Sequence, residues 1–194
     1  MRVFLAGASG AIGRQLVPLL VAEGHEVAGT TRSEAKVELL RELGAEPVVV
    51  DVYDAEALRD AVVAFGPDLV MHQLTDLPDD PAEVANFGAA NARMRDVGTS
   101  NLVAAAKAAG AERLLAQSTA FIPGGGPESR ERHERQVLDY PGVVLRYGML
   151  YGPGTYHEDG KPEDGSPWVS VVEAARRTLD HLEAPSGVVE LVED

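Results

Sequence analysis

Three glycines near the start of the sequence constrain the fold of this chain more than any other feature. Gly7, Gly10 and Gly13 follow a short apolar run over residues 2–6 and precede a segment of helical period over residues 11–22. Glycines between a strand and a helix permit a tight turn and let the backbone approach a pyrophosphate, which the N–H groups of the helix start can bind. We expect a positive φ at Gly10. The predicted phosphate-binding residues are Gly7, Ser9, Gly10, Ala11, Ile12 and Gly13.

Short apolar runs alternate with longer segments of helical period along the whole chain. The seven runs that we predict to be strands cover residues 2–6, 26–30, 46–50, 68–72, 112–117, 142–147 and 187–192. Helices are predicted over residues 11–22, 33–43, 54–65 and 82–109, with a short one around 131–139. This alternation is typical of βα units around a parallel sheet. We therefore predict a doubly wound α/β fold with strand order 3-2-1-4-5-6-7 and a nucleotide site at the carboxyl ends of the first and fourth strands.

The charge balance of the chain excludes several classes of partner. The 17 basic and 31 acidic side chains give a net charge of −14, and a polyanion repels phosphate backbones and anionic lipid headgroups. We therefore expect a small-molecule substrate and no nucleic-acid or membrane partner. Because the sequence shows no signal peptide and no apolar stretch long enough to span a membrane, we expect a cytoplasmic location. Because there is no cysteine and the five histidines show no ligand spacing, we predict no metal site.

Further motifs follow the glycines in order along the chain. They are Asp51-Val52, Asn91 with Arg95, Gly98-Thr99-x-Asn101-Leu102, Ala116-Gln117-Ser118, and the segment from Leu145 to Gly154. Together with the Gly-x-x-Gly-x-x-Gly spacing, they resemble the short-chain dehydrogenase/reductase superfamily, and most of all its extended and atypical branch of NAD-dependent epimerases and dehydratases. The resemblance implies a Rossmann-like dinucleotide-binding domain over residues 1–150 and a reduced substrate region over 151–194, packed on the same domain. It also implies a homodimer formed through the helices over 82–109 and 131–139.

The second predicted strand leads into the sequence Thr30-Thr31-Arg32-Ser33. An enzyme that uses NAD usually places an acidic residue here to bind the ribose hydroxyls. Arg32 can instead stack on adenine and pair with a 2′-phosphate, and the hydroxyls of Thr31 and Ser33 can add donors. We therefore predict NADP as the cofactor, with NAD as the alternative. In a second interpretation, Arg32 is a solvated residue at the start of the next helix.

The resemblance also implies roles for residues after the third and fourth strands. Asp51 would accept a hydrogen bond from the adenine amino group and Val52 would pack on the ring, although Asp51 could equally cap a helix. His72, Gln73 and Leu74 would line the nicotinamide ribose. His72 and Gln73 are larger than the small residues typical of the family, and a lone histidine at a strand end is more often a structural hydrogen-bonding group.

The catalytic residues are less well defined by the pattern. The resemblance implies that Thr119, or Ser118 as second choice, supplies the hydroxyl that binds the substrate oxygen. The family's Tyr-x-x-x-Lys pair is absent from this sequence, because the residues four positions after the five tyrosines are Ala57, Val144, Tyr151, Thr155 and Gly160. The candidates for proton transfer are therefore His72, Thr119 with a relayed water, and Tyr147 or Tyr151.

Two functions are consistent with this sequence. The first is an NADP- or NAD-dependent oxidoreductase or epimerase/dehydratase that acts on a small carbonyl or sugar-like metabolite by hydride transfer. The second is a catalytically silent dinucleotide-binding sensor or regulatory protein. The absent Tyr-x-x-x-Lys pair and the short substrate region favour the second function, whereas the resemblance favours the first.

Overall fold

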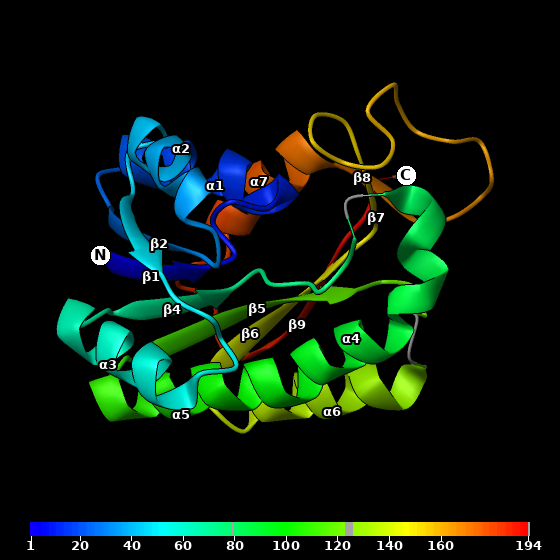
Figure 1. Cartoon of the computed structure of the whole chain (residues 1–194). Helices are drawn as coiled ribbons and strands as arrows, with labels where there is room; N and C mark the ends of the chain where they lie inside the picture. The colour runs from blue at the N-terminus through cyan, green and yellow to red at the C-terminus, as the bar shows by residue number, and fades with distance from the viewer. Residues whose placement is uncertain (79, 123–125, 194) are drawn as a thin grey trace.

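A seven-stranded parallel sheet forms the centre of the molecule (Figure 1). The computed structural model describes residues 1–78, 80–122 and 126–193. The strands lie in the order β3-β2-β1-β4-β5-β6-β9, and each neighbouring pair is parallel, which confirms the predicted fold and strand order. The strands are β1 (Arg2–Ala6), β2 (Glu26–Thr31), β3 (Glu46–Val49), β4 (Leu69–His72), β5 (Arg113–Thr119), β6 (Gly142–Tyr147) and β9 (Gly187–Leu191).

Helices cover both faces of this sheet. The α-helices are α1 (Ala11–Ala22), α2 (Val37–Glu42), α3 (Ala55–Phe65), α4 (Gly88–Arg93), α5 (Thr99–Ala109), α6 (Pro127–Leu138) and α7 (Val171–Leu179), and a short 3-10 helix, η1 (Glu34–Lys36), precedes α2. Helices α1 and α7 pack against each other on one face, whereas α3, α5 and α6 lie on the other (Figure 1). In the described part of the chain, no helix is both long enough and apolar enough to cross a membrane.

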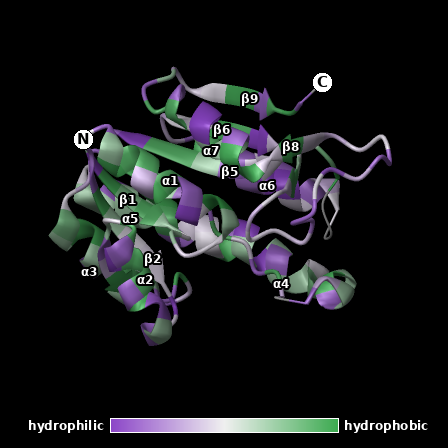
Figure 2. Cartoon of the chain, turned by 90° about the horizontal axis from the view of Figure 1, so that it is seen from above, coloured by the Kyte–Doolittle hydropathy of each residue, from purple (hydrophilic) through white to green (hydrophobic). Residues whose placement is uncertain are grey.

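Two hydrophobic cores result from the alternation of side chains along the strands. In β1, Val3 and Leu5 belong to the core shared with α1 and α7, whereas Phe4 and Ala6 belong to the core shared with α3, α5 and α6. All four side chains are at most 1% exposed, so this uninterrupted apolar strand is buried from both sides. Figure 2 shows hydrophobic residues concentrated on the strands and inner helix faces, with hydrophilic residues toward the outside.

The predicted helix over residues 82–109 is divided into four segments. η2 (Pro81–Phe87) is a 3-10 helix, α4 follows it, η3 (Met94–Gly98) has π geometry, and α5 completes the run. A Cβ atom on Gly98 would lie 2.6 Å from the sulfur of Met94, so the glycine makes room for this buried methionine at the π turn. The sequence pattern therefore predicts the helical run but not the changes of hydrogen-bonding pattern within it.

A second, small sheet follows β6 and is absent from the sequence-based prediction. Its two parallel strands are β7 (Met149–Tyr151) and β8 (Trp168–Ser170). A Cβ atom on Gly148 would lie 2.6 Å from the carbonyl oxygen of Pro167, so the close approach of the two segments requires glycine at this position. α6 also differs from the prediction, because it begins at Pro127, about one turn before the expected start, with proline in a favourable first helical position.

Candidate functional site

Gly7 and Gly13 hold the loop between β1 and α1 in close contact with neighbouring backbone. Gly7 has a φ of +92°, which side chains other than glycine rarely adopt. A Cβ atom on Gly7 would lie 2.8 Å from the carbonyl carbon and oxygen of Gln73, and one on Gly13 would lie 2.3 Å from the carbonyl oxygen of Gly7. Both positions therefore require glycine, because the loop packs directly on the end of β4 and on the start of α1.

Gly10 differs from the other two glycines because it is exposed. Its φ is −81°, so the positive φ that we expected there is wrong, and the residue with positive φ in this loop is Gly7. Gly10 precedes α1, where no side chain caps the helix and no acidic residue lies in the first turn. The N–H groups of Ala11, Ile12 and Gly13 therefore point out of the helix start beside a residue without a side chain, and this arrangement fits a pyrophosphate.

The end of β2 is tied to this loop by two threonine hydroxyls. The Gly7 N–H donates to Thr30 Oγ1 at 3.1 Å. The Ser33 N–H donates to Thr31 Oγ1 at 3.1 Å, and the Ser9 hydroxyl donates to the same oxygen at 3.4 Å. Thr31 is only 6% exposed. Its oxygen is therefore used within the protein, and its main role in the geometry is to position the loop and the chain after β2.

Arg32 follows β2 with its side chain 52% exposed, and it contacts a residue that the sequence analysis missed. Its Nη2 lies 3.2 Å from Asp76 Oδ1. The Tyr53 hydroxyl donates to Asp76 Oδ2 at 3.2 Å, and the Arg93 guanidinium lies 3.9 Å from the centre of the Tyr53 ring. Burial and the neighbouring Asp76 carboxylate raise the pKa of Tyr53. These four side chains form a group at the carboxyl edge of the sheet, which we call the Asp76 cluster.

Asp51 and Val52 follow β3, as predicted, but they have different exposures. Asp51 is exposed, and its Oδ1 accepts from the Tyr53 N–H at 2.9 Å. Asp51 does not cap α3, because that role belongs to Asp54, whose carboxylate accepts from the Ala57 N–H at 3.0 Å. Val52 is 5% exposed and packs in the core, so only a small part of it is available to an adenine ring.

His72 lies at the end of β4 and points toward α5, away from α1. Its Nδ1 accepts from the Leu74 N–H at 3.2 Å, and its Nε2 lies 3.1 Å from Thr99 Oγ1. Thr99 Oγ1 lies 2.7 Å from Nδ1 of His133, whose Nε2 lies 2.8 Å from the carbonyl oxygen of Gln117. Because a carbonyl oxygen only accepts, His133 donates from Nε2 and accepts the Thr99 proton, and His72 donates to Thr99 from Nε2.

This arrangement makes His72 a buried structural group. Both histidines are at most 1% exposed. Desolvation lowers the pKa of both, and for His72 it is reinforced by the neighbouring His133 and Arg95. With both ring nitrogens bonded, His72 presents neither a proton nor a lone pair to the carboxyl edge of the sheet. The structure therefore favours the structural interpretation of His72 over the role in proton transfer.

Gln73 and Tyr147 lie on the opposite face, toward α7. Gln73 Nε2 donates to the Tyr147 hydroxyl at 3.3 Å, and this hydroxyl lies 2.7 Å from Thr178 Oγ1. Because Thr178 donates to the carbonyl oxygen of Ala174 at 2.7 Å, the Tyr147 hydroxyl donates to Thr178. Tyr147 is 3% exposed, and burial raises its pKa to about 12. Tyr147 is therefore a poor acid near neutral pH.

Ser118 and Thr119 lie on opposite faces at the end of β5. The Ser118 hydroxyl is buried and donates to Glu134 Oε1 at 2.6 Å. The Arg146 guanidinium donates to the same carboxylate at 2.9 and 2.7 Å. Thr119 is half-buried, and its hydroxyl donates to the carbonyl oxygen of Phe121 at 2.9 Å. Of the two hydroxyls, the Thr119 group is therefore the more accessible, and it can turn toward another acceptor or donor.

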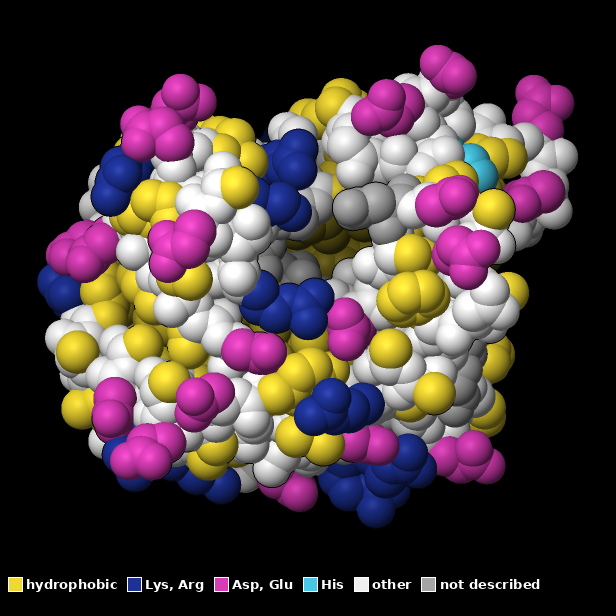
Figure 3. Space-filling model, in the orientation of Figure 1, with side chains coloured by type: hydrophobic (Ala, Val, Ile, Leu, Met, Phe, Trp, Pro, Cys, Tyr) yellow, Lys and Arg dark blue, Asp and Glu magenta, His cyan; other side chains and the backbone are white. Residues whose placement is uncertain are grey.

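The surface of the molecule is hollowed on one face. Figure 3 shows a hollow between the part of the molecule that contains α1 and α2 and the part that contains the loop before β8, with Lys and Arg side chains at its rim. A basic rim on a chain with a net charge of −14 favours an anionic ligand at this place. Among the described residues, no group of three or more His, Asp or Glu side chains is arranged to hold a metal ion.

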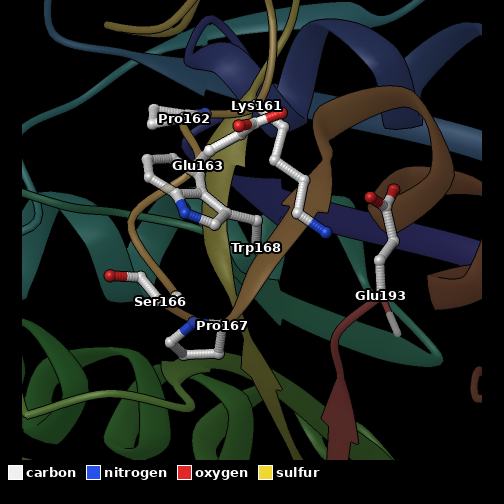
Figure 4. A pocket seen from close by; sticks show the side chains of 8 residues that line it. Lys161, Pro162, Glu163, Ser166, Pro167, Trp168 and Glu193 are labelled. Carbon is white, nitrogen blue, oxygen red and sulfur yellow. The ribbon is translucent and has the colours of Figure 1, made fainter.

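A separate pocket of about 710 Å³ lies in the C-terminal part of the chain (Figure 4). It is lined by Lys161, Pro162, Glu163, Gly165, Ser166, Pro167, Trp168 and Glu193. The lining residues all come from the loop before β8, from β8 and from the C-terminal segment. This pocket therefore does not include the phosphate-binding loop or any of the predicted catalytic residues. Tyr151 lies beside it and donates to Glu193 at 2.9 Å.

A protein-family profile described as NAD(P)H-binding matches residues 7–141. The chain belongs to this NAD(P)H-binding family. The matched range includes the phosphate-binding loop, the Asp76 cluster and the end of β5. The match to the NAD(P)H-binding family therefore covers the part of the chain that holds most of the candidate site.

Two curated reductases are similar to the chain over most of its length. The 3-diazoavenalumate denitrifying reductase of a Streptomyces species is 43% identical over 189 residues, which cover 82% of this chain and 60% of that protein. The 4-hydroxy-2-methyl-3-oxo-4-farnesyl-3,4-dihydroquinoline-1-oxide ketoreductase of Stigmatella aurantiaca is 32% identical over 164 residues, which cover 79% of this chain and 47% of that protein. The chain thus spans between about half and three-fifths of the length of these relatives.

Solved structures with the same fold include UDP-glucose 4-epimerases. The UDP-glucose 4-epimerase of Thermotoga maritima superposes with a TM-score of 0.81 at 20% identity, covering 99% of this chain and 77% of that one. The UDP-glucose 4-epimerase of Thermus thermophilus, in complex with NAD, superposes with a TM-score of 0.78 at 23% identity, covering 99% and 78%. These superpositions confirm the Rossmann-like fold that the resemblance implied.

Proposed function

We propose that this protein is an NADPH-dependent reductase that transfers a hydride to a small carbonyl compound. The observation that carries the proposal is the uncapped start of α1 beside exposed Gly10, with Arg32 at the end of β2 where NAD enzymes usually place an acidic residue. The NAD(P)H-binding family and the two reductase relatives support reduction with a nicotinamide cofactor, and the ketoreductase among them supports a carbonyl substrate. The nicotinamide supplies the hydride when it is bound, and the protein binds and orients the reactants.

The proposal assigns the cofactor contacts to residues at the carboxyl edge of the sheet. The N–H groups at the start of α1 bind the pyrophosphate, Arg32 pairs with the 2′-phosphate, and exposed Asp51 accepts from the adenine amino group. The hydroxyls of Ser9, Thr31 and Ser33, with the buried edge of Val52, shape the adenosine side. The backbone of His72, Gln73 and Leu74 lines the nicotinamide ribose, and their side chains hold that backbone in place.

The proposal gives Thr119 the role of holding the substrate oxygen. An unassisted hydroxyl is a poor acid near neutral pH, so Thr119 stabilises the developing charge by a hydrogen bond and does not supply the proton. Ser118, His72 and Tyr147 are buried and bonded within the protein, which supports assigning them structural roles. We therefore assign the proton that completes the reduction to water that enters the partly open site.

Exposed apolar side chains favour a substrate with an aromatic or alkyl part. Leu77 is 38% exposed, Ile122 is 60% exposed and Tyr156 is 38% exposed, and they lie on the connections after β4, β5 and β7. The carboxyl ends of parallel strands meet at one edge of a sheet, and the Tyr156 hydroxyl donates to the carbonyl oxygen of Pro78. We assign these three side chains to an apolar rim on the substrate side of the nicotinamide. The ketoreductase relative is named for a farnesyl dihydroquinoline oxide, a compound with such an alkyl part.

Two expectations about organisation complete the proposal. Residues 1–150 act as the dinucleotide-binding domain, and residues 151–194 act as a reduced substrate region that includes β8 of the second sheet and packs on the same domain. The homodimer expected through the run from η2 to α5 and through α6 stays a prediction. Light scattering at micromolar concentration tests it, and a monomer would contradict it.

Deuterium transfer is the experiment that tests the proposed reaction. NADPH labelled with deuterium at C4 is incubated with a panel of aryl and alkyl ketones, and the products are examined for the label. We expect label in the alcohol product and loss of absorbance of the reduced nicotinamide. The variant Gly10→Val is the control, because it blocks the pyrophosphate site and should remove both signals. Tight NADPH binding without deuterium transfer to any ketone would instead support the silent sensor.

A further inference from the structure

Asp76 holds a position that links three parts of the carboxyl edge. One carboxylate oxygen lies 3.2 Å from the Arg32 guanidinium after β2, and the other accepts from the Tyr53 hydroxyl after β3. The Asp76 N–H donates to Asn91 Oδ1 at 3.2 Å in α4. The Asp76 side chain is 20% exposed. Asp76 is therefore a fixed, partly buried carboxylate beside the cation that the proposed function assigns to the 2′-phosphate.

We propose that Asp76 determines the selectivity of this protein between phosphorylated and unphosphorylated dinucleotides. The inference rests on the proposed function, because it requires Arg32 to lie beside the adenosine ribose. In that position Asp76 competes for Arg32 with a 2′-phosphate, which carries between about −1.5 and −2 charges near neutral pH. NADPH binding must then overcome the repulsion between the phosphate and Asp76.

The same carboxylate favours the unphosphorylated dinucleotide. NAD enzymes of this fold usually carry an acidic residue at the end of the second strand, which accepts from the ribose hydroxyls. Here Arg32 occupies that region of the sequence, and Asp76 brings a carboxylate to within 3.2 Å of it from the connection after β4. A ribose 2′-hydroxyl can donate to Asp76, whereas a phosphate cannot. Asp76 thus supplies from another strand the acceptor that the chain lacks after β2.

The negative charge of Asp76 distinguishes a role in cofactor selectivity from a role in holding the loop in place. Asp76→Asn keeps the size of the side chain, an oxygen acceptor for Tyr53 or Arg32 and the backbone bond to Asn91, but it removes the negative charge. Tyr53→Phe removes a hydrogen bond to Asp76 and keeps the charge. If electrostatic repulsion governs selectivity, the first substitution alters it and the second alters it much less.

The test is the affinity of the full chain for NADPH and NADH, measured by calorimetry at one low ionic strength because salt screens these charges. For Asp76→Asn we expect NADPH to bind roughly tenfold more tightly, as expected for charges a few ångströms apart at a partly exposed site. We expect NADH to bind more weakly, because its ribose hydroxyl loses an ionised acceptor. Glu183→Gln is the matched charge control, because Glu183 is exposed in the turn before β9, at the opposite edge of the sheet, and should leave both affinities unchanged.

Arg32→Ala separates a failure of this inference from a failure of the proposed function. If Arg32→Ala weakens NADPH binding selectively while Asp76→Asn leaves the ratio of the two affinities within about twofold of wild type, then the role of Asp76 is refuted and the NADPH assignment stands. If Arg32→Ala changes neither affinity, the 2′-phosphate assignment is wrong and the inference fails with it. An equal effect of Tyr53→Phe and Asp76→Asn would also refute the inference, since it would show that loop position and not charge controls selectivity.

Discussion

The buried pair His72 and His133 makes the stability of this fold sensitive to mild acid. The two rings are 5.3 Å apart and are joined through the Thr99 hydroxyl. Both pKa values are lowered in the folded protein, for which desolvation is the main cause. In the unfolded chain both imidazoles titrate near their usual value of about 6.5. Below that pH the unfolded state therefore binds more protons than the folded state, and acid favours unfolding.

The size of this effect follows from proton linkage. For one histidine that stays neutral in the folded state, protonation stabilises the unfolded state by RT ln(1 + 10^(pKa − pH)), where the pKa in the unfolded chain is about 6.5. Lowering the pH from 7 to 5.5 increases this stabilisation by about 1.2 kcal/mol. Two such histidines lower the free energy of unfolding by up to about 2.5 kcal/mol over this interval. The stability that they contribute is therefore fully present above pH 7 and decreases as the pH falls through the range from about 6.5 downward.

Urea unfolding at pH 7 and pH 5.5 measures this difference. His133→Gln removes one of the two titrating groups, and we expect it to lose about 1.2 kcal/mol of the pH-dependent difference, whatever it does to stability at pH 7. His181→Gln is the matched substitution outside the buried pair. For each variant we compare how much the difference between the free energies of unfolding at pH 7 and pH 5.5 decreases, and we expect a larger decrease for His133→Gln. If the two variants lose the same amount, the imidazole at position 133 is protonated in the folded protein and the hydrogen-bond directions derived above are wrong.

Three further predictions concern the candidate site. Gly10→Val should weaken NADPH binding by at least about a hundredfold with an unchanged circular dichroism spectrum, because Gly10 is exposed where a pyrophosphate must approach; unchanged affinity in calorimetry would show that the phosphate site is elsewhere. Thr119→Val should lower kcat by a factor equivalent to about 2.7 to 4 kcal/mol without weakening NADPH binding, and full activity in the steady-state assay would remove Thr119 from the site. Tyr147→Phe should lower the free energy of unfolding by about 1 to 2 kcal/mol, since it leaves the partners of a buried hydroxyl without their bond; a loss of turnover at unchanged stability would instead make Tyr147 catalytic.

The fold was predictable because its main determinants are local or periodic. The glycines after β1, the seven apolar runs and the helical segments between them define a parallel sheet with few possible connections. The π turn at Met94–Gly98 depends on the close approach of the Met94 side chain to Gly98, which has no side chain, and the small sheet of β7 and β8 depends on the approach of Pro167 to Gly148. Neither contact has a periodic signature, so neither could be predicted from the sequence pattern.

The positions of the candidate site residues along the chain were predictable, but the face of the sheet to which each side chain points was not predicted. His72 and Gln73 are neighbours at a strand end, yet one points toward α5 and the other toward α7, and Ser118 and Thr119 differ in the same way. Alternation along the strands contains this information, since residues with the parity of Ala116 face the core under α3, α5 and α6. The Asp76 cluster has no comparable signal, because Arg32 and Tyr53 reach Asp76 from connections 44 and 23 residues away.

The structure also gives a physical reason why α6 does not replace the missing Tyr-x-x-x-Lys pair. The residues of α6 that face the sheet include His133 and Glu134, and both are bonded to groups of the sheet or of α5. Although burial opposes it, hydrogen bonds from Arg146 and Ser118 hold the pKa of Glu134 below its usual value. Near neutral pH Glu134 is therefore ionised and His133 is neutral, with its proton donated to a carbonyl oxygen. These two side chains anchor the helix in fixed protonation states near neutral pH, so the proton for the proposed reduction must come from outside this group.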